Sequence, residues 1–152
     1  MPDPLPLPER RANETLGEPF QVNNVIGDGN CLYRALSLEV LGTQNYHEQI
    51  RAKIVDIMLQ NPGTFEGYVG RNIGDYVLEH SLPLRTWGTD VEIYAAATLL
   101  QTCIVVYTSV NEARREWIQH LPLFPIPSIE FSQENIYFKN LCSHFERVVS
   151  IR

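Results

Sequence analysis

The chain has 152 residues, 44% of them hydrophobic and 20% charged, which is the composition of one ordinary soluble domain. Its 18 acidic residues outnumber the 12 lysines and arginines, so the formal net charge is −6. This balance argues against a nucleic-acid partner, because phosphate contacts need clustered basic side chains. A basic protein or peptide suits such a surface better.

Cysteine usage and apolar patterning predict the compartment. Three cysteines without framework spacing indicate a reducing environment, where a reactive thiol survives. The first nine residues alternate proline with acid and leucine, unlike the basic start and apolar run of a secretory signal. The longest strongly apolar run, residues 93–100, is too short to cross a bilayer. We therefore expect a soluble monomer of the cytoplasm, with the nucleus as a second location and no membrane partner.

The N-terminal stretch differs in composition from the rest of the chain. Residues 1–17 carry prolines at positions 2, 4, 6 and 8, a pattern typical of extended or flexible chain. We predict that this stretch is a tail or the end of a linker, and that residues 18–152 form one domain. Residues 20–26 then read as a short strand that leads into a turn.

The next segment places a cysteine where a turn becomes a helix. Asp28, Gly29 and Asn30 favour turn conformations, and the run after Cys31 has helical periodicity up to Gly42. In the first helical turn, the macrodipole and the free backbone N–H groups favour the thiolate form of Cys31. The turn could also act as an oxyanion loop by aiming N–H groups at a developing negative charge. A plainer interpretation stays open, namely a turn and cap followed by a buried, inert cysteine.

Two further helices have recognisable starts. Asn45 and Glu48 have the spacing of a capping box, which predicts a helix that ends near residue 61. Thr89 and Glu92 repeat that spacing before a second helix over residues 90–100. The residues between these helices are less regular, with a short helix expected at 73–79.

The strands cluster towards the C-terminus, at residues 102–107, 116–121, 134–139 and 145–151. The first of them makes Cys103 a core residue. Early helices followed by clustered strands predict an α+β fold with a central, mainly antiparallel sheet flanked by helices.

A catalytic cysteine needs a base, and the chain offers four histidines: His47, His80, His120 and His144. A base of this kind is held in place by a third polar group. Only His144 has an acid two residues on, Glu146, and these positions share one face of an extended strand. A surface position is expected for His47. A zinc site at Cys142 and His144 would lack further ligands, so we predict no metal and no cofactor.

Four blocks, in this order, resemble the ovarian tumour (OTU) family of cysteine proteases, most of which are deubiquitinases. They are residues 28–35 (DGNCLYRA), 47–51 (HEQIR), Trp87–Gly88 with Glu92–Ile93, and 144–148 (HFERV). The resemblance implies a papain-like OTU fold, in which Cys31 attacks, His144 transfers the proton and Glu146 orients His144. It also carries Asp28 over as an active-site residue, which we interpret as shaping the oxyanion loop. The chain departs from the family pattern at Glu146, where Asn or Asp is common, and at Thr89, where a second glycine is common.

The same resemblance implies a function and a partner. It implies an isopeptidase that cleaves after the Gly-Gly end of ubiquitin, with ubiquitin or polyubiquitin as the partner. Trp87 and Phe145 are candidate walls for the narrow channel that two glycines need. Two alternatives stay open: an OTU-like module that binds ubiquitin without cutting it, and a protease for ubiquitin-like modifiers or viral polyproteins. The intact Cys31, His144 and Glu146 favour catalysis.

Overall fold

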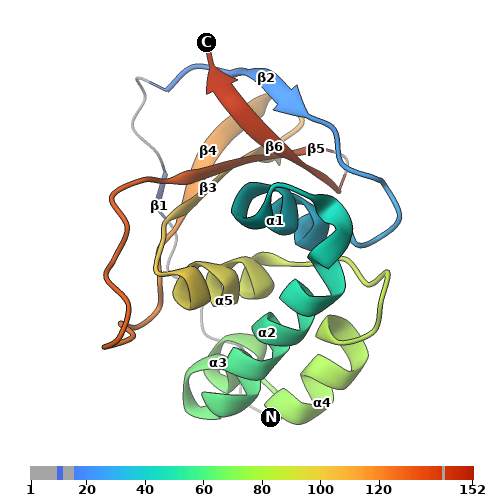
Figure 1. Ribbon diagram of the computed structural model, residues 1–152, viewed down its shortest axis with the longest axis vertical. Helices are drawn as coiled ribbons and strands as arrows, with labels where there is room; N and C mark the ends of the chain where they lie inside the picture. The colour runs from blue at the N-terminus through green and yellow to red at the C-terminus, as the bar shows by residue number, and fades with distance from the viewer. Residues whose placement is uncertain (1–9, 12–15, 142) are drawn as a thin grey trace.

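The computed structural model describes residues 10–11, 16–141 and 143–152, and the helices among them lie on one face of a sheet (Figure 1). In this part of the chain the sheet has six strands, in the order β1-β4-β3-β5-β6-β2. They are β1 (Arg10–Arg11), β2 (Pro19–Asn23), β3 (Ile104–Asn111), β4 (Arg114–His120), β5 (Ile136–Leu141) and β6 (His144–Ile151). Neighbouring strands are antiparallel except β3 and β5, which are parallel. The predicted α+β class with a mainly antiparallel sheet is therefore confirmed.

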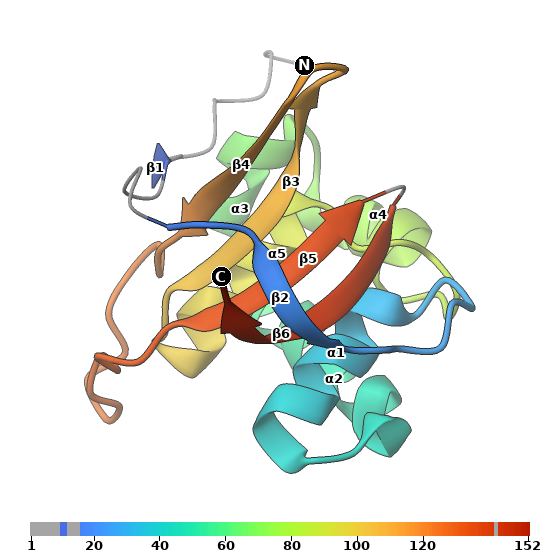
Figure 2. The same ribbon diagram turned by 90° about the horizontal axis from the view of Figure 1, so that it is seen from above.

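The helices form a layer under the sheet, with α1 below β6, as the view from above also shows (Figures 1 and 2). They are α1 (Cys31–Leu41), α2 (His47–Gln60), α3 (Pro62–Val69), α4 (Ile73–Tyr76) and α5 (Asp90–Leu100), with a 3₁₀ turn at Gln44–Tyr46 and a π-helical turn at Val77–Ser81. The longest, α2, has 14 residues, so no described helix could cross a bilayer.

The alternation of side chains along β3 separates two apolar clusters. Ile104 and Val106 belong to the main core shared with the helices, while Val105 and Tyr107 belong to a smaller cluster with Trp117. Cys103 lies in the smaller cluster and is 3% exposed. Its predicted core position is confirmed.

Helix α3 is the element that the sequence pattern did not predict. Gly63 and Gly67 lower helical propensity, but Pro62 fits the first helical turn and Gly70 ends the helix in the left-handed region at φ 71°. Phe65 is fully buried from this helix. Burial of one aromatic ring thus outweighs the weak local preference.

Helix α2 begins later than its apparent capping box suggests. Thr43, rather than Asn45, accepts a cap hydrogen bond, from Asn45 N–H at 3.3 Å, and it caps the 3₁₀ turn that precedes the helix. The helix itself starts at His47 without a side-chain cap. The expected cap at Asn45 is therefore wrong, because the extra turn uses the residues between Thr43 and His47.

Most of the predicted tail, residues 1–9 and 12–15, lies outside the described residues. Within it, Arg10–Arg11 pairs with β4 as an edge strand. Leu16 packs on the smaller cluster, and Trp117 Nε1 donates a hydrogen bond to the Gly17 carbonyl at 2.6 Å. These contacts place Leu16 and Gly17 with the domain, while the boundary at residue 18 stays a prediction.

The capping box of α5 is present, as predicted. Glu92 Oε1 accepts hydrogen bonds from the Thr89 N–H and hydroxyl, both at 2.8 Å. Its Oε2 accepts from the Tyr76 hydroxyl at 2.8 Å, so the carboxyl also joins α4 to α5. Glu92 is fully buried, and this burial raises its pKa.

We expect Glu92→Ala to lower the free energy of unfolding by about 1–3 kcal/mol, because the part-buried bonds from the Thr89 N–H and the Tyr76 hydroxyl lose their acceptor. Equilibrium urea unfolding measures the change. Glu112→Ala is the control, since Glu112 is exposed in the β3–β4 connection, and its effect should stay within about 0.5 kcal/mol. Equal losses in the two variants would contradict this role of Glu92.

Candidate active site

Cys31 is the first residue of α1, as the sequence predicts. The Asn30 carbonyl accepts the first hydrogen bond of the helix, from Arg34 N–H at 2.9 Å. Cys31 is 3% exposed, and its Sγ lies 3.7 Å from the carbonyl oxygen of Ser143. The start of α1 therefore faces the turn between β5 and β6.

That turn delivers His144 to the same place. Leu141 pairs with His144 across this turn, and Ser143, directly before His144, is left-handed at φ 61°. A Cβ on Gly27 would lie 3.6 Å from both Nδ1 and Cε1 of His144, which shows that the imidazole packs against the nucleophile loop, residues 27–30. Cys31 and His144, distant in sequence, therefore both border this loop, although no hydrogen bond joins these two described side chains.

The carboxylate of Asp28 is turned into the loop. It accepts hydrogen bonds from Arg34 Nη2 at 2.7 Å and from Asn30 Nδ2 and the Asn30 N–H, both at 3.1 Å. The bonds from Arg34, followed by those from Asn30, hold the pKa of Asp28 far below its usual range. These contacts support the interpretation of Asp28 as a loop-shaping residue, which stays a prediction.

The predicted oxyanion loop does not offer all its N–H groups. The Asn30 N–H is already bonded to Asp28, whereas the N–H groups of Gly29 and Cys31 donate to no described residue. Gly29 has φ 85°, and a Cβ there would lie 2.4 Å from the Arg85 carbonyl oxygen. Only glycine fits this conformation and this close approach. The N–H groups of Gly29 and Cys31 are therefore available in this loop, and the oxyanion role of the loop stays a prediction.

Arg51 is the residue of this region that sequence reasoning missed. It is 1% exposed, and its Nη2 donates to Asn30 Oδ1 at 3.0 Å beneath the nucleophile loop. The signal was present in the sequence, because Arg51 continues the buried stripe of Ile54 and Met58 at helical spacing. A charged residue in such a stripe indicates a buried polar contact.

The predicted orienter Glu146 lies on the same strand as His144 but is not bonded to it. Glu146 pairs with Lys139 across β5, and both Glu146 and His144 are partly exposed. No hydrogen bond or ion pair joins these two described side chains. Catalytic hydrogen bonds can be long in a substrate-free enzyme, so the role of Glu146 stays a prediction.

His47 is buried rather than on the surface, which corrects our expectation. It is 9% exposed at the start of α2, and burial lowers its pKa, with a smaller contribution from Arg34. The additional turn before α2 folds this histidine back towards α1.

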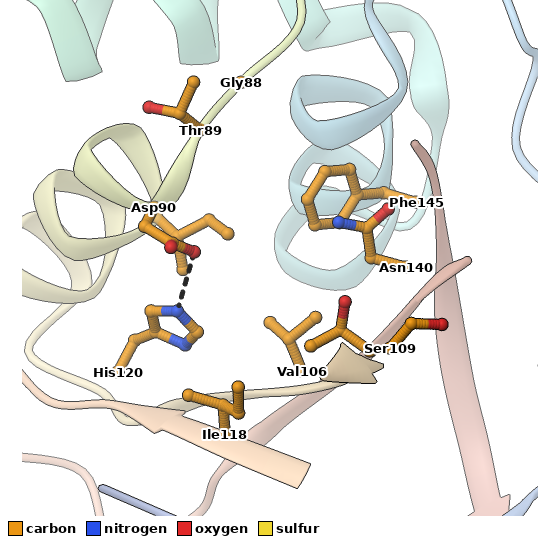
Figure 3. A pocket seen from close by; sticks show the side chains of 11 residues that line it. Gly88, Thr89, Asp90, Val106, Ser109, Ile118, His120, Asn140 and Phe145 are labelled. Carbon is orange, nitrogen blue, oxygen red and sulfur yellow. Dashed lines mark hydrogen bonds and ion pairs between the residues drawn. The ribbon is translucent and has the colours of Figure 1, made fainter. Parts of the chain in front are cut away.

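Trp87 and Phe145, the candidate substrate walls, have different environments. Trp87 is 61% exposed, whereas Phe145 is 3% exposed and lines a cavity of about 370 Å³ together with Gly88 and Asn140. The cavity extends to His120 and Asp90, whose Nε2 and Oδ1 are 3.4 Å apart (Figure 3). The substrate roles of Trp87 and Phe145 stay predictions.

Gly88 connects this cavity to the nucleophile helix. A Cβ on Gly88 would lie 2.1 Å from Leu32 Cδ2, so the backbone after Trp87 packs directly on the first turn of α1. The backbone that lines one side of the cavity thus contacts Leu32, the residue after Cys31, while Cys31 and His144 do not line the cavity themselves.

Comparison with known proteins decides the family. The model of the OTU-like cysteine proteases matches residues 26–150, which include the nucleophile loop and β6 up to its next-to-last residue. The chain belongs to this family. The structure of the OTUD1 OTU domain covers 85% of this chain and 85% of its own, with a TM-score of 0.72 and 23% identity. This likeness confirms the OTU fold.

One sequence relative and one further solved structure extend the comparison. The chain is 35% identical over 104 residues to OVARIAN TUMOR DOMAIN-containing deubiquitinating enzyme 10 of Arabidopsis thaliana, covering 68% of this chain and 29% of that protein. It therefore spans less than a third of that relative. The Hazara virus OTU, solved bound to ubiquitin, has a TM-score of 0.65 and 14% identity, with 87% of this chain and 81% of its own chain covered.

We expect Asp28→Asn to lower the free energy of unfolding on the order of 1 kcal/mol at neutral pH, because the partly exposed pair with Arg34 is lost. The lowered native pKa makes this contribution complete above the unfolded value of about 4, and it disappears as the pH falls towards the native value. Urea unfolding from about pH 7 down to pH 3 should show wild type and variant converging in acid. Asp56→Asn, at an exposed carboxylate that contacts Gln60, is the control. A constant difference across the range would contradict the assignment.

Proposed function

We propose that this domain is a thiol-dependent isopeptidase that removes ubiquitin from conjugates or cleaves ubiquitin chains. The observation that carries the proposal is the meeting of Cys31, at the start of α1, with the Ser143–His144 turn. Two similarities support ubiquitin as the substrate. The Arabidopsis relative is named a deubiquitinating enzyme, and the Hazara virus OTU was solved with ubiquitin.

The proposed reaction has two halves. Cys31 Sγ attacks the carbonyl carbon of the terminal glycine while His144 accepts the thiol proton. His144 then returns this proton to the lysine amine as the C–N bond breaks, which leaves a thioester on Cys31. A water molecule, deprotonated by His144, attacks the thioester, and the products are the glycine carboxylate and the free thiol.

Charge develops on the carbonyl oxygen in both halves of the reaction. The N–H groups of Gly29 and Cys31 are the free donors at the start of α1, where the helix dipole also favours negative charge. Asp28 keeps the Asn30 N–H bonded and so fixes the loop that presents them. No metal is required for this chemistry.

A path for a narrow tail is offered by the cavity whose lining includes Gly88, the residue packed on Leu32 next to Cys31. Gly88 and Phe145 line it close to α1, and Trp87 is exposed next to Gly88. A tail ending in two glycines has no side chains to clash there. The net charge of −6 favours a basic tail during encounter.

We propose that the domain acts as a monomer in the reducing cytoplasm, with the nucleus as a second location.

We expect Cys31→Ala to abolish turnover and covalent capture by a ubiquitin probe with a thiol-reactive end, because no other described thiol starts a helix beside His144. Among the described cysteines, Cys103 is the matched control: Cys103→Ala should alter stability while the folded protein keeps its capture rate. Mass spectrometry of the adduct measures covalent capture, and cleavage of ubiquitin chains measures turnover.

Each alternative function gives its own result. Binding of ubiquitin without capture would favour a non-catalytic module. Capture of another modifier, with ubiquitin ignored, would favour a protease for ubiquitin-like proteins. Wild-type turnover by Cys31→Ala would overturn the proposed mechanism.

We expect activity at position 146 to rank Glu, then Gln, then Ala, if substrate binding draws Glu146 onto His144. Loss of a triad carboxylate costs about 10⁴-fold in serine proteases, and about 10- to 1000-fold is expected here because a thiolate needs less help from its base. Lys139→Ala is the control, since Lys139 pairs with Glu146 across the hairpin. The rate of iodoacetamide alkylation against pH should change in Glu146→Ala and not in Lys139→Ala. An unchanged profile with near-normal cleavage would move the orienting role to another residue.

A further inference from the structure

Arg51 makes an unusual set of contacts for a buried cation. Its Nη1 donates to the Ser81 carbonyl at 2.7 Å and to Thr86 Oγ1 at 2.9 Å. Its Nη2 donates to the Thr86 carbonyl and to Asn30 Oδ1, both at 3.0 Å. The guanidinium carbon lies 3.8 Å from the centre of the Tyr33 ring. All of these acceptors are neutral.

This set is not arranged for stability alone. Burying a cation costs several kcal/mol unless charge and hydrogen bonds compensate it, and among the described residues no carboxylate lies within ion-pair distance of Arg51. Burial accordingly lowers the pKa of Arg51, although an arginine stays protonated. A planar guanidinium does provide five directed donors in a rigid fork, which an apolar side chain cannot. The four bonds made here come from Nη1 and Nη2, while the buried Nε has no partner among the described residues. What it fixes is the relative position of two loops.

The two loops are the nucleophile loop and residues 81–86. Asn30 Oδ1 accepts a hydrogen bond from Arg51 Nη2 and a second one, 2.7 Å long, from the Arg85 N–H. With its oxygen held by these two donors, the Asn30 carboxamide must point Nδ2 at Asp28, and the bond is 3.1 Å long. The Asp28 carboxylate is thereby held where it also accepts the Asn30 N–H. Arg51 therefore helps, through Asn30, to hold the Asp28 carboxylate on the Asn30 N–H, alongside the bonds that Arg34 donates to the same carboxylate.

We propose that Arg51 is a positioning residue for the reaction: through Asn30 it sets the orientation of the nucleophile loop and locks that loop to residues 81–86. The inference rests on the proposed function, because its effect on rate requires turnover of ubiquitin. Arg51 touches no reacting atom. It acts on kcat by keeping the N–H groups of Gly29 and Cys31 aimed at the oxyanion.

The lock also extends towards the substrate side. Residues 81–86 lead directly into Trp87, which is 61% exposed, and into Gly88, which packs on Leu32. A substrate that contacts this segment is therefore coupled to the nucleophile loop through the hydrogen bonds of Arg51. Loss of the lock should affect the chemical step more than substrate affinity.

The test compares Arg51→Lys with Arg71→Lys. A lysine keeps the charge at position 51 but has one ammonium group, which cannot bridge both loops. Arg71 is the matched control because its guanidinium bonds Glu79 on the surface. In Arg51→Lys, assayed well below its unfolding midpoint, kcat should fall by about 10- to 100-fold with KM within about twofold. Arg71→Lys should match wild type in both constants.

A second variant covers the case in which Arg51→Lys does not fold. Thr86→Val removes one acceptor of Arg51 and leaves the guanidinium in place. It should give a smaller decrease in kcat, again with KM nearly unchanged. Wild-type kcat in folded Arg51→Lys, or in Thr86→Val when Arg51→Lys is unfolded, overturns the proposal. An equal loss in Arg71→Lys overturns it as well.

Amide hydrogen exchange separates this inference from the proposed function. The N–H groups of Asn30 and Arg85 are both bonded within the locked loops, so they should exchange faster in Arg51→Lys while the core strands keep their protection. This readout needs no substrate. If wild type fails to cleave ubiquitin, the proposed function fails, and unchanged exchange at these two amides would then overturn the positioning role independently.

Discussion

The site depends on the packing of the start of α1 against the start of β6. Phe145 belongs to the core beneath the sheet, and Arg147 of the same strand bonds Glu39 of α1 and Asn23 of β2. These contacts fix β6 over the helix, so His144, at the first position of the strand, must lie at the helix N-terminus. The backbone of His144 is further held by its pairing with Leu141 of β5. Core packing, rather than any bond between catalytic side chains, sets the geometry.

Local sequence signals predicted the elements with strong boundaries. Helix α1 begins at Cys31 and stops at Gly42, whose left-handed conformation at φ 76° suits only glycine easily, and α5 has the expected box at Thr89. Helix α3 could not be predicted in the same way, because its two internal glycines weaken the local preference and Phe65 is buried by tertiary contacts. The order of strands in the sheet likewise depends on long-range pairing that periodicity does not contain.

The candidate site shows a similar division between position and contact. The spacing of His144 and Glu146 predicts a shared strand face, but it cannot predict a hydrogen bond, which depends on rotamers and on the substrate. The turn before Cys31 was recognisable, whereas the use of the Asn30 N–H by Asp28 required coordinates. Arg51 was visible as a charge in an apolar stripe and as the last residue of the 47–51 block, but neither pattern gave it a role. Its partners lie far away on both sides, at Asn30 earlier in the chain and at Ser81 and Thr86 later in it, so no local pattern could identify them.

The charges around the nucleophile loop oppose the charge of the whole chain. The molecule carries −6, yet Arg34, Arg51 and the start of α1 all place positive charge at the loop. Asp28 pairs with Arg34, while Glu92, the other acid that acts on Arg51, is buried with its pKa raised. Burial limits screening, so this local field persists at salt concentrations that weaken the attraction of a basic tail to the acidic surface. Substrate encounter and oxyanion stabilisation therefore depend on different charges, and the buried arginine can serve the second without opposing the first.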